Sequence, residues 1–233
     1  EGKRSGAFSW GTYDSRPYML QTWNGTLGDV YTLAHELGHS MHSYYSHKNQ
    51  PYHLSGYTIF VAEVASTLNE ALLSQYIIKN MPDSDLAKSV LSESIENFEG
   101  TVLRQVLFAT FEKEAAKISD SGEVFTADAL EDVYFNLNKE WYGKSCEYPD
   151  FIKNEWMRIP HFYSAFYVYK YATSFCASLA LSQMLKTNHN ETKDKIFKFL
   201  KAGGSKPPLQ ILKESGIDFT NSAAIDNAFK NYE

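Results

Sequence analysis

The segment His35-Glu36-Leu37-Gly38-His39 places two histidines four positions apart, with a glutamate directly after the first. On an α-helix, side chains at positions i and i+4 lie one turn apart on the same face. Two imidazole nitrogens in this arrangement can bind one zinc ion at about 2.0–2.1 Å, and a neighbouring carboxylate can take a proton from a water molecule at the metal. The H-E-x-x-H pattern therefore predicts a zinc site with His35 and His39 as ligands and Glu36 as the general base.

His42 continues the histidine series but does not fit the same ion. It lies seven positions past His35, which is about 10.5 Å along a helix axis. Three imidazoles spread over this distance cannot all come within about 2.1 Å of one metal ion, so we exclude His42 as a ligand. A longer zinc pattern with a third histidine also fails, because it needs histidine where the chain has Tyr45.

A catalytic zinc site usually has three protein ligands, so the third must come from another element. Glu63 follows His39 by twenty-four positions and lies within the mostly apolar sequence "FVAEVAS". An acid in such surroundings is costly to bury unless it binds something. Glu70 shares its helix face seven positions on, and could bind the metal itself or orient a ligating histidine. We favour Glu63 as the third ligand and keep Glu70 as the alternative.

A helix over about 27–46 must carry the two histidines. Thr26 followed by Asp29 matches a capping box, which marks the start of this helix. Apolar side chains repeat at three-to-four spacing on the side opposite the histidines. We expect the following set to face the core: Val30, Ala34, Leu37, Met41 and Tyr44.

The rest of the pattern predicts a mainly α fold with a small β unit at the N-terminal end. "GAFSW" and "YMLQTW" indicate two short strands before the histidine helix. The sequence "AGGSKPP" fits either a mobile loop near a cleft or an inert connector. A second helix is expected over about 59–79, a long one over 84–119 with a division at Gly100, and another from Thr126 to about 142. The segment that opens with the turn at Pro160 is expected to continue as a helix to about 186. Shorter helices are expected over 192–202, 207–215 and 221–231.

The composition and net charge of the chain argue against some classes of binding partner. The chain has 233 residues with 43% hydrophobic and 21% charged residues, which is ordinary for a globular protein. Its net charge of −6 argues against nucleic acid as a partner, and the sequence has no apolar run long enough for a membrane span. Two cysteines do not make a disulfide framework, so we expect a reducing, cytoplasmic location.

These motifs resemble segments of the oligoendopeptidase F family, whose members are relatives of thimet oligopeptidase. The resemblance is specific at "HELGHSMH" (35–42) and "IFVAEVASTLNE" (59–70). It extends to "GKRSGAFSWGTYDSRPYML" (2–20) and "HFYSAFYVYKYATSF" (161–175).

The resemblance implies a zincin-like helical catalytic domain over 1–233. One zinc ion would be bound by His35, His39 and Glu63, with Glu36 as the general base, while His42 is characteristic of the family without binding the metal. Family members ordinarily carry a long N-terminal helical region as well. Because the chain begins at Glu1 rather than at methionine, we expect a fragment whose missing N-terminal part completes the substrate channel.

The resemblance also implies that a segment rich in histidine and tyrosine stabilises the oxyanion of the reaction. Hydrogen-bond donors are needed there because the tetrahedral intermediate of peptide hydrolysis carries negative charge. His161 follows Pro160 at a helix entrance, and Tyr167 and Tyr171 share a helix face four positions apart. We favour Tyr171, with Tyr167 next, and packing of a helix is the competing role for each tyrosine.

The leading function is a zinc-dependent endopeptidase that hydrolyses internal bonds of short peptides. An exposed edge of the strand "GAFSW" is a candidate surface for pairing with an extended peptide. A zinc exopeptidase could share the same ligands, although no "GxMEN" segment is present to anchor a free amino terminus. A third possibility is a metal-containing peptide-binding fragment without activity on its own. Purely structural zinc is least consistent, because it ordinarily takes four protein ligands.

Overall fold

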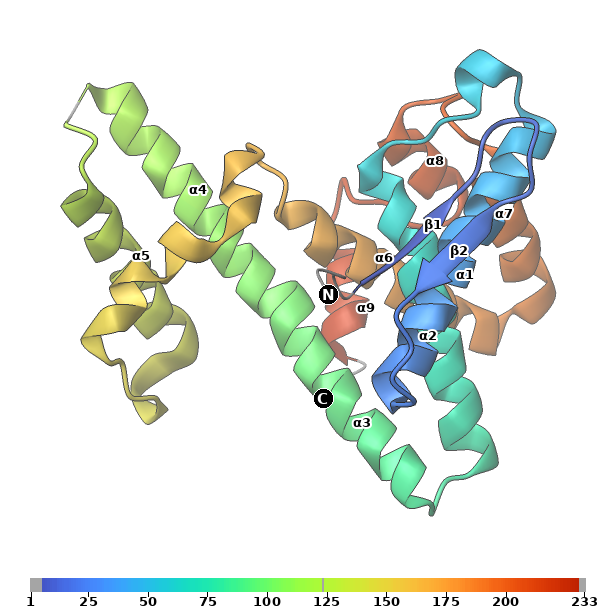
Figure 1. Cartoon of the computed structure of the whole chain (residues 1–233), viewed down its shortest axis with the longest axis horizontal. Coiled ribbons are helices and arrows are strands. Elements are labelled where there is room, and N and C mark those ends of the chain that lie inside the picture. The colour runs from blue at the N-terminus through green and yellow to red at the C-terminus, as the bar shows by residue number, and fades with distance from the viewer. Residues whose placement is uncertain (1–5, 123, 231–233) are drawn as a thin grey trace. The chain divides into compact units, whose positions relative to one another are not determined.

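The computed structural model describes residues 6–122 and 124–230, and it is mainly helical with one small antiparallel sheet (Figure 1). The expected fold class is therefore confirmed. The strands and helices are β1 Ala7–Trp10, β2 Tyr18–Gln21, α1 Leu27–Asn49, α2 Ile59–Asn80, α3 Asp85–Phe98, α4 Arg104–Ser121, α5 Ala127–Tyr142, α6 Tyr169–Thr187, α7 His189–Lys201, α8 Pro208–Glu214 and α9 Ala223–Lys230. Residues 2–5 of the N-terminal family segment and residue 231 of the last expected helix lie outside the described residues.

The chain divides into two compact units. The first comprises residues 1–96 and 173–233, and the second comprises residues 97–172. The expectation that 1–233 acts as one catalytic domain stays a prediction.

The start of α1 is set by the capping box expected from its sequence. The backbone N–H of Asp29 donates to Oγ1 of Thr26 at 3.3 Å, and the backbone N–H of Thr26 donates to Oδ2 of Asp29 at 2.8 Å. Two of the amides that a helix start leaves without partners are satisfied in this way. The helix continues to Asn49, three residues beyond its expected end, and Pro51 follows its C-cap, Gln50.

α1 packs closely on α2, because Gly38 allows the two backbones to approach. A Cβ built on Gly38 would lie 2.5 Å from Cα of Ser66 and 2.6 Å from the carbonyl oxygen of Ala65, which is closer than real Cβ atoms come. Hydrogen bonds also join the helices on the N-terminal side of Gly38: Nδ2 of Asn69 donates to the Ala34 carbonyl at 2.6 Å. One turn away from the histidines, the hydroxyls of Tyr31 and Ser74 are 2.7 Å apart.

The prediction of which side of α1 faces the core is wrong. Val30, Leu37, Met41 and Tyr44 are all exposed, by 37 to 44% of their surface. The buried positions of the helix include Glu36, Gly38 and His42, which lie towards the histidine side. Helical periodicity separates the two sides of α1, but the contact with α2 decides which of them is buried.

The two strands form a hairpin beside α1 (Figure 1). Phe8 pairs with Leu20 and Trp10 with Tyr18, and all four side chains are exposed on one face. The residues between them point the other way, where the hydroxyls of Ser9 and Ser40 are 2.8 Å apart and attach the hairpin to α1. The outward face of this sheet is therefore apolar, which is unusual for a surface sheet.

The core of the first unit lies between α2 and the C-terminal helices. Its fully buried side chains come from α2, α6, α7 and α8, and they include Val64, Leu181, Phe199 and Leu212. The "AGGSKPP" segment is a packed connector, because the amide of Gly204 donates to the Leu54 carbonyl at 2.7 Å.

The second unit has its own core, built by α4, α5 and the 3-10 segments that follow. The division expected at Gly100 is present as a π-helical turn, Glu99–Leu103, between α3 and α4. Glu155 is the polar centre of this unit: it accepts hydrogen bonds from Arg104 at 2.6 Å and from the Tyr134 hydroxyl at 2.7 Å. Tyr134 is fully buried among aromatic neighbours from α4.

Gly38→Ala tests the close approach of α1 and α2. The added methyl group has no space, so the helices must separate, and we expect the free energy of unfolding to fall by about 1–3 kcal/mol. Gly28→Ala is the matched control on the same helix, because the nearest atom to its added Cβ is 3.7 Å away and stability should change by about 0.5 kcal/mol or less. Urea unfolding of both variants measures the difference, and equal stabilities would contradict the proposed role of Gly38.

Candidate metal centre

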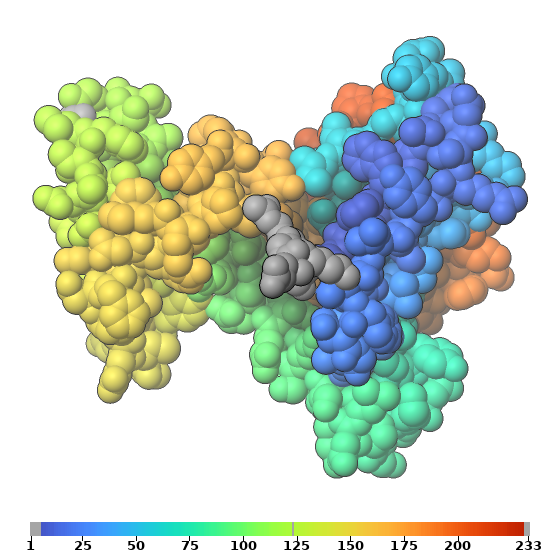
Figure 2. Space-filling model, viewed as in Figure 1, coloured from blue at the N-terminus to red at the C-terminus, as the bar shows by residue number. Residues whose placement is uncertain are grey.

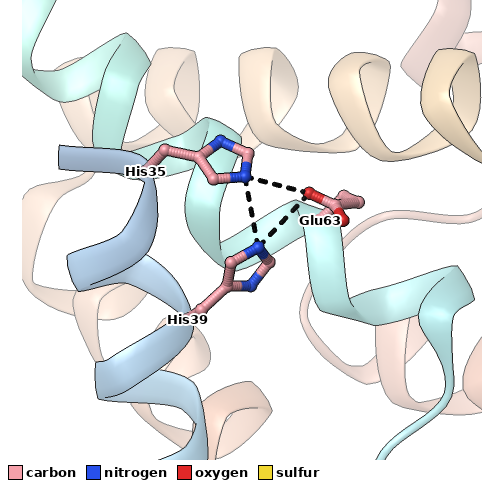
Figure 3. A group of neighbouring side chains, drawn as sticks. All are labelled: His35, His39 and Glu63. Carbon is pink, nitrogen blue, oxygen red and sulfur yellow. Dashed lines mark hydrogen bonds and ion pairs between the residues drawn. The ribbon is translucent and has the colours of Figure 1, made fainter. Parts of the chain in front are cut away.

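Three side chains from two helices point their ligand atoms at one another (Figure 3). Nε2 of His35 and Nε2 of His39 are 3.2 Å apart. Oε2 of Glu63, on α2, is 3.3 Å from the first nitrogen and 3.5 Å from the second. Within the described residues, this is the group of histidine, cysteine and acidic side chains whose geometry suits a metal ion.

The spacing of these atoms fits a tetrahedral metal. Ligands at about 2.0–2.1 Å from a zinc ion, separated by tetrahedral angles, lie about 3.3 Å from one another. The three measured separations fall close to this value. Two imidazoles and a carboxylate are also the chemical set that catalytic zinc sites use, and three protein ligands leave a fourth position open.

Glu63 is held in place by its own helix. It lies in the second turn of α2, where the hydroxyl of Ser66 donates to its Oε2 at 3.0 Å. Ser66 is fully buried and is also the residue against which Gly38 packs. Ser66 was not among the residues expected at the site, and the only signal for it in the sequence is a hydroxyl three positions after the acid, one helical turn away.

Glu70, the alternative ligand, takes a different position. Its Oε1 is hydrogen-bonded to Nδ1 of His35, the ring nitrogen on the far side from Glu63. A carboxylate on the second nitrogen of a ligating histidine fixes the orientation of the ring and makes its other nitrogen a better ligand. The structure therefore places Glu70 as the residue that orients His35.

The pKa values of these side chains show that the group favours a positive charge at its centre. Burial alone would lower the pKa of His35, but the carboxylates of Glu63 and Glu70 outweigh it and raise this pKa to about 10. Burial would raise the pKa of Glu63, yet hydrogen bonds from His35 and His39 hold it well below its ordinary value. Without metal, a proton on His35 supplies the positive charge that the two carboxylates require.

Glu36 is buried on α1 and stays outside this triangle. His42 is also absent from the group, in agreement with its exclusion as a ligand. Its side chain is 1% exposed, and its ring stacks on that of Tyr57.

The three residues expected to act on the oxyanion form a cluster in the second unit. The Tyr171 hydroxyl and Nε2 of His161 are 3.2 Å apart, within hydrogen-bond distance. The ring centroids of His161 and Tyr167 are 5.9 Å apart, and those of Tyr167 and Tyr171 are 5.6 Å apart. Tyr163, by contrast, is 88% exposed.

His161 lies on a short 3-10 helix, Pro160–Tyr163, Tyr171 lies in the first turn of α6, and Tyr167 lies in the loop between these two elements. Phe166 within the loop has a φ of +53°, a left-handed conformation that costs energy for a bulky residue. Its amide donates to Oε1 of Glu112 at 2.9 Å, and burial raises the pKa of Glu112. Glu112 therefore holds the loop from α4, and nothing in its local sequence indicated this role.

Comparisons with known proteins place these features in a family. The model of peptidase family M3 matches residues 1–231. The chain belongs to peptidase family M3. It is 44% identical to oligopeptidase PepF of Bacillus subtilis over 233 residues, covering all of this chain and 35% of the relative.

Solved structures agree with this membership. A crystal structure of a Chlamydophila abortus protein matches with 46% identity and a TM-score of 0.88, covering 97% of this chain and 38% of that one. Oligoendopeptidase F from Enterococcus faecium matches with 38% identity and a TM-score of 0.78, covering 88% of this chain and 37% of that one. The family resemblance read from the motifs is thus confirmed, and this M3 chain spans little more than a third of the length of these relatives.

Glutamine substitutions distinguish the roles of the two glutamates. Glu63→Gln replaces the charged side chain expected as the third metal ligand, so we expect it to abolish stoichiometric zinc binding at micromolar protein. Glu70→Gln removes only the residue that orients His35, and should weaken zinc binding by about 10–100-fold while keeping one ion per chain at saturation. Zinc content after dialysis and chelator competition measure both effects, and the reverse order would make Glu70 the ligand.

The pH dependence of zinc binding follows from the raised pKa of His35. Since this pKa is about 10 in the metal-free protein, zinc must displace a proton from His35 throughout the range from pH 6.5 to 8.5. The affinity for zinc should therefore rise by about tenfold for each unit of pH, and fall equally on acidification. Competition titrations at several pH values test this, and an affinity that levels off near pH 6.5, the ordinary pKa of histidine, would contradict it.

Proposed function

We propose that this M3 chain carries the catalytic site of a zinc-dependent endopeptidase that hydrolyses internal bonds of short oligopeptides. The observation that carries the proposal is the triangle of His35, His39 and Glu63, with spacing suited to one zinc ion, in a chain of a peptidase family. Relatives named as oligopeptidase and oligoendopeptidase support peptides as the substrate class.

Zinc held by these three residues would supply a Lewis acid and lower the pKa of a water molecule into the neutral range. Glu36 would act as the general base. It takes a proton from the attacking water and then delivers this proton to the nitrogen of the departing amine. Its place beside His35 on the rigid, capped helix α1 supports this role, since proton transfer requires a fixed distance to the reacting atoms.

His161 and Tyr171, with Tyr167 next to them, are proposed to stabilise the oxyanion. Their mutual contacts support the assignment, because the hydrogen bond between Tyr171 and His161 holds both side chains in defined positions. A pre-oriented donor stabilises negative charge without reorganisation during the reaction. The two groups belong to different compact units, so their joint action on one substrate is part of the proposal.

The peptide is proposed to bind in an extended conformation along the hairpin. A two-stranded sheet leaves outer strand edges that can pair with a further strand, and β1 was the expected edge. The hydroxyl contact between Ser9 on β1 and Ser40 on α1 supports this path, because Ser40 is the residue directly after the proposed ligand His39.

The remainder of the channel is proposed to come from chain outside these residues. The relatives are longer, and the first unit exposes a surface of the kind that another layer of protein covers. This surface includes the outward face of the hairpin, coloured dark blue in Figure 2, and the apolar side of α1. Such a wall would allow short peptides to reach the site and would exclude larger substrates.

No helix among the described residues is long and apolar enough to span a membrane. Both cysteines are free, Cys146 at the surface and Cys176 in the interior. The cytoplasmic location expected from the cysteines stays a prediction, as does the absence of a nucleic-acid partner expected from the net charge of −6.

Cleavage of a fluorescence-quenched peptide of about ten residues, blocked at both ends, tests the proposed activity. We expect the wild type to cut an internal bond with one zinc bound, and Glu36→Gln to retain the zinc while losing activity by at least about 100-fold, because the general base is removed. Tyr171→Phe in the same assay should lower kcat with little change in zinc content.

The blocked ends distinguish the competing functions. A zinc exopeptidase would leave this peptide intact but would cut its unblocked counterpart. If wild type and Glu36→Gln both bind one zinc and neither cuts either peptide, the 233 residues bind metal without forming a complete peptidase, and the proposal is wrong for this chain.

A further inference from the structure

His42 is a buried histidine of the H-E-x-x-H helix that the proposed chemistry does not use. Its ring lies parallel to that of Tyr57, with centroids 3.7 Å apart and an angle of 8° between the planes. The ring of Phe199, from α7, lies with its centroid 4.9 Å from that of His42. A buried histidine in contact with two aromatic rings is suited to packing, since each ring provides a large, rigid contact surface.

We propose that His42 is a positioning residue for the metal site: its stack on Tyr57 sets where α2 begins and thereby holds Glu63 in reach of His35 and His39. The inference rests on the proposed zinc site. It adds a residue outside the ligand set and gives a physical reason for the third histidine of the motif.

The route from His42 to Glu63 is short. Tyr57 directly precedes Thr58, the N-cap of α2, and Glu63 follows five positions later. Thr58 makes no side-chain cap hydrogen bond, so the helix start lacks the anchor that α1 has at Thr26. The position of this first turn must come from contacts outside α2, and Tyr57 provides one directly beside it.

Hydrogen bonds support the stack from the same side of α1. The hydroxyls of Tyr57 and Ser43 are 2.7 Å apart, and Ser43 is adjacent to His42. One turn later the hydroxyl of Ser46, also fully buried, donates to the carbonyl of Ser55 in the connection to α2. The last turns of α1 thus determine the path of the chain that enters α2.

Two contacts between α1 and α2 therefore bracket Glu63. His42 meets Tyr57 before the glutamate, and Gly38 meets Ser66 after it. Because Glu63 lies between these points on a rigid helix, its backbone cannot move away from the two imidazoles unless one contact is lost, and the Ser66 hydroxyl holds its carboxylate. The ligand histidines are on the same helix as both contacts, so a single element sets all three ligands.

The chemistry of His42 agrees with packing rather than proton transfer. Burial lowers its pKa to about 3, so the ring is neutral at physiological pH. Its Nδ1 is buried and has no hydrogen-bond partner in the described part of the chain. A phenyl ring of similar size should therefore replace the imidazole with little loss, whereas a methyl group should not.

The test compares zinc binding by the His42→Ala and His42→Phe variants of the 233-residue chain. We expect His42→Ala to raise the Kd for zinc by about 10–100-fold, the range typical of residues that support ligands, and His42→Phe to keep it within about threefold of wild type. Chelator competition gives the Kd, and the visible absorption spectrum of the cobalt(II)-loaded protein reports ligand geometry. Both readouts are independent of peptidase activity.

Leu212→Ala is the control for a merely structural effect. Leu212 is fully buried in the core of the same unit, on α8, and is neither a metal ligand nor part of the stack. The Leu212→Ala variant should have a lower thermal unfolding temperature, as His42→Ala should, but its zinc Kd and cobalt spectrum should be those of the wild type. If His42→Ala does not fold, Tyr57→Leu removes the same stack and takes its place.

Each result decides between the two proposals. If wild type and Leu212→Ala do not bind zinc, the metal site itself is wrong. If both bind zinc and His42→Ala binds it equally well, the metal site stands and the positioning role is overturned. The positioning role would also be overturned if His42→Phe bound zinc as weakly as His42→Ala, or if Leu212→Ala bound zinc as weakly as either of these variants.

Discussion

The close contact between α1 and α2 is the constraint on which the proposed metal site depends. Zinc ligands must converge within about 3.3 Å of one another, so the helix that carries the histidines and the helix that carries Glu63 have to touch. Gly38 makes this possible, since any side chain there would meet the backbone of Ser66. The glycine inside the H-E-x-x-H segment therefore has a structural reason that is separate from metal chemistry.

Burial of the histidine side follows from this contact. Polar groups removed from water need partners, and three are provided here: Asn69 for a carbonyl of α1, Ser66 for Glu63, and Glu70 for His35. The carboxylates in turn require a positive charge, which is why the pKa of His35 is raised to about 10 in the metal-free protein. Packing and electrostatics thus both favour a cation at the same point.

The division into two units separates the two parts of the proposed chemistry. The metal residues lie in the first unit, where the capped helix α1 and the core under α2 hold them. His161, Tyr167 and Tyr171 lie in the second, in and around a loop that Glu112 holds through a hydrogen bond from the strained Phe166. Each group is ordered within its own unit. The apolar surface left on α1 and the hairpin agrees with a chain that spans little more than a third of its longer M3 relatives.

The sequence by itself determined the features that depend on local spacing. The i, i+4 histidines, the capping box at Thr26, the break at Gly100 and most helix limits follow from residues that are neighbours along the chain, and family motifs indicated Glu63. Only the tertiary structure decided which side of α1 is buried, that Glu70 orients His35, and that His42 stacks on Tyr57. The physical reason is that periodicity defines the stripes of a helix but does not name the element that covers each stripe. That choice depends on contacts between residues distant in sequence, such as Gly38 with Ser66.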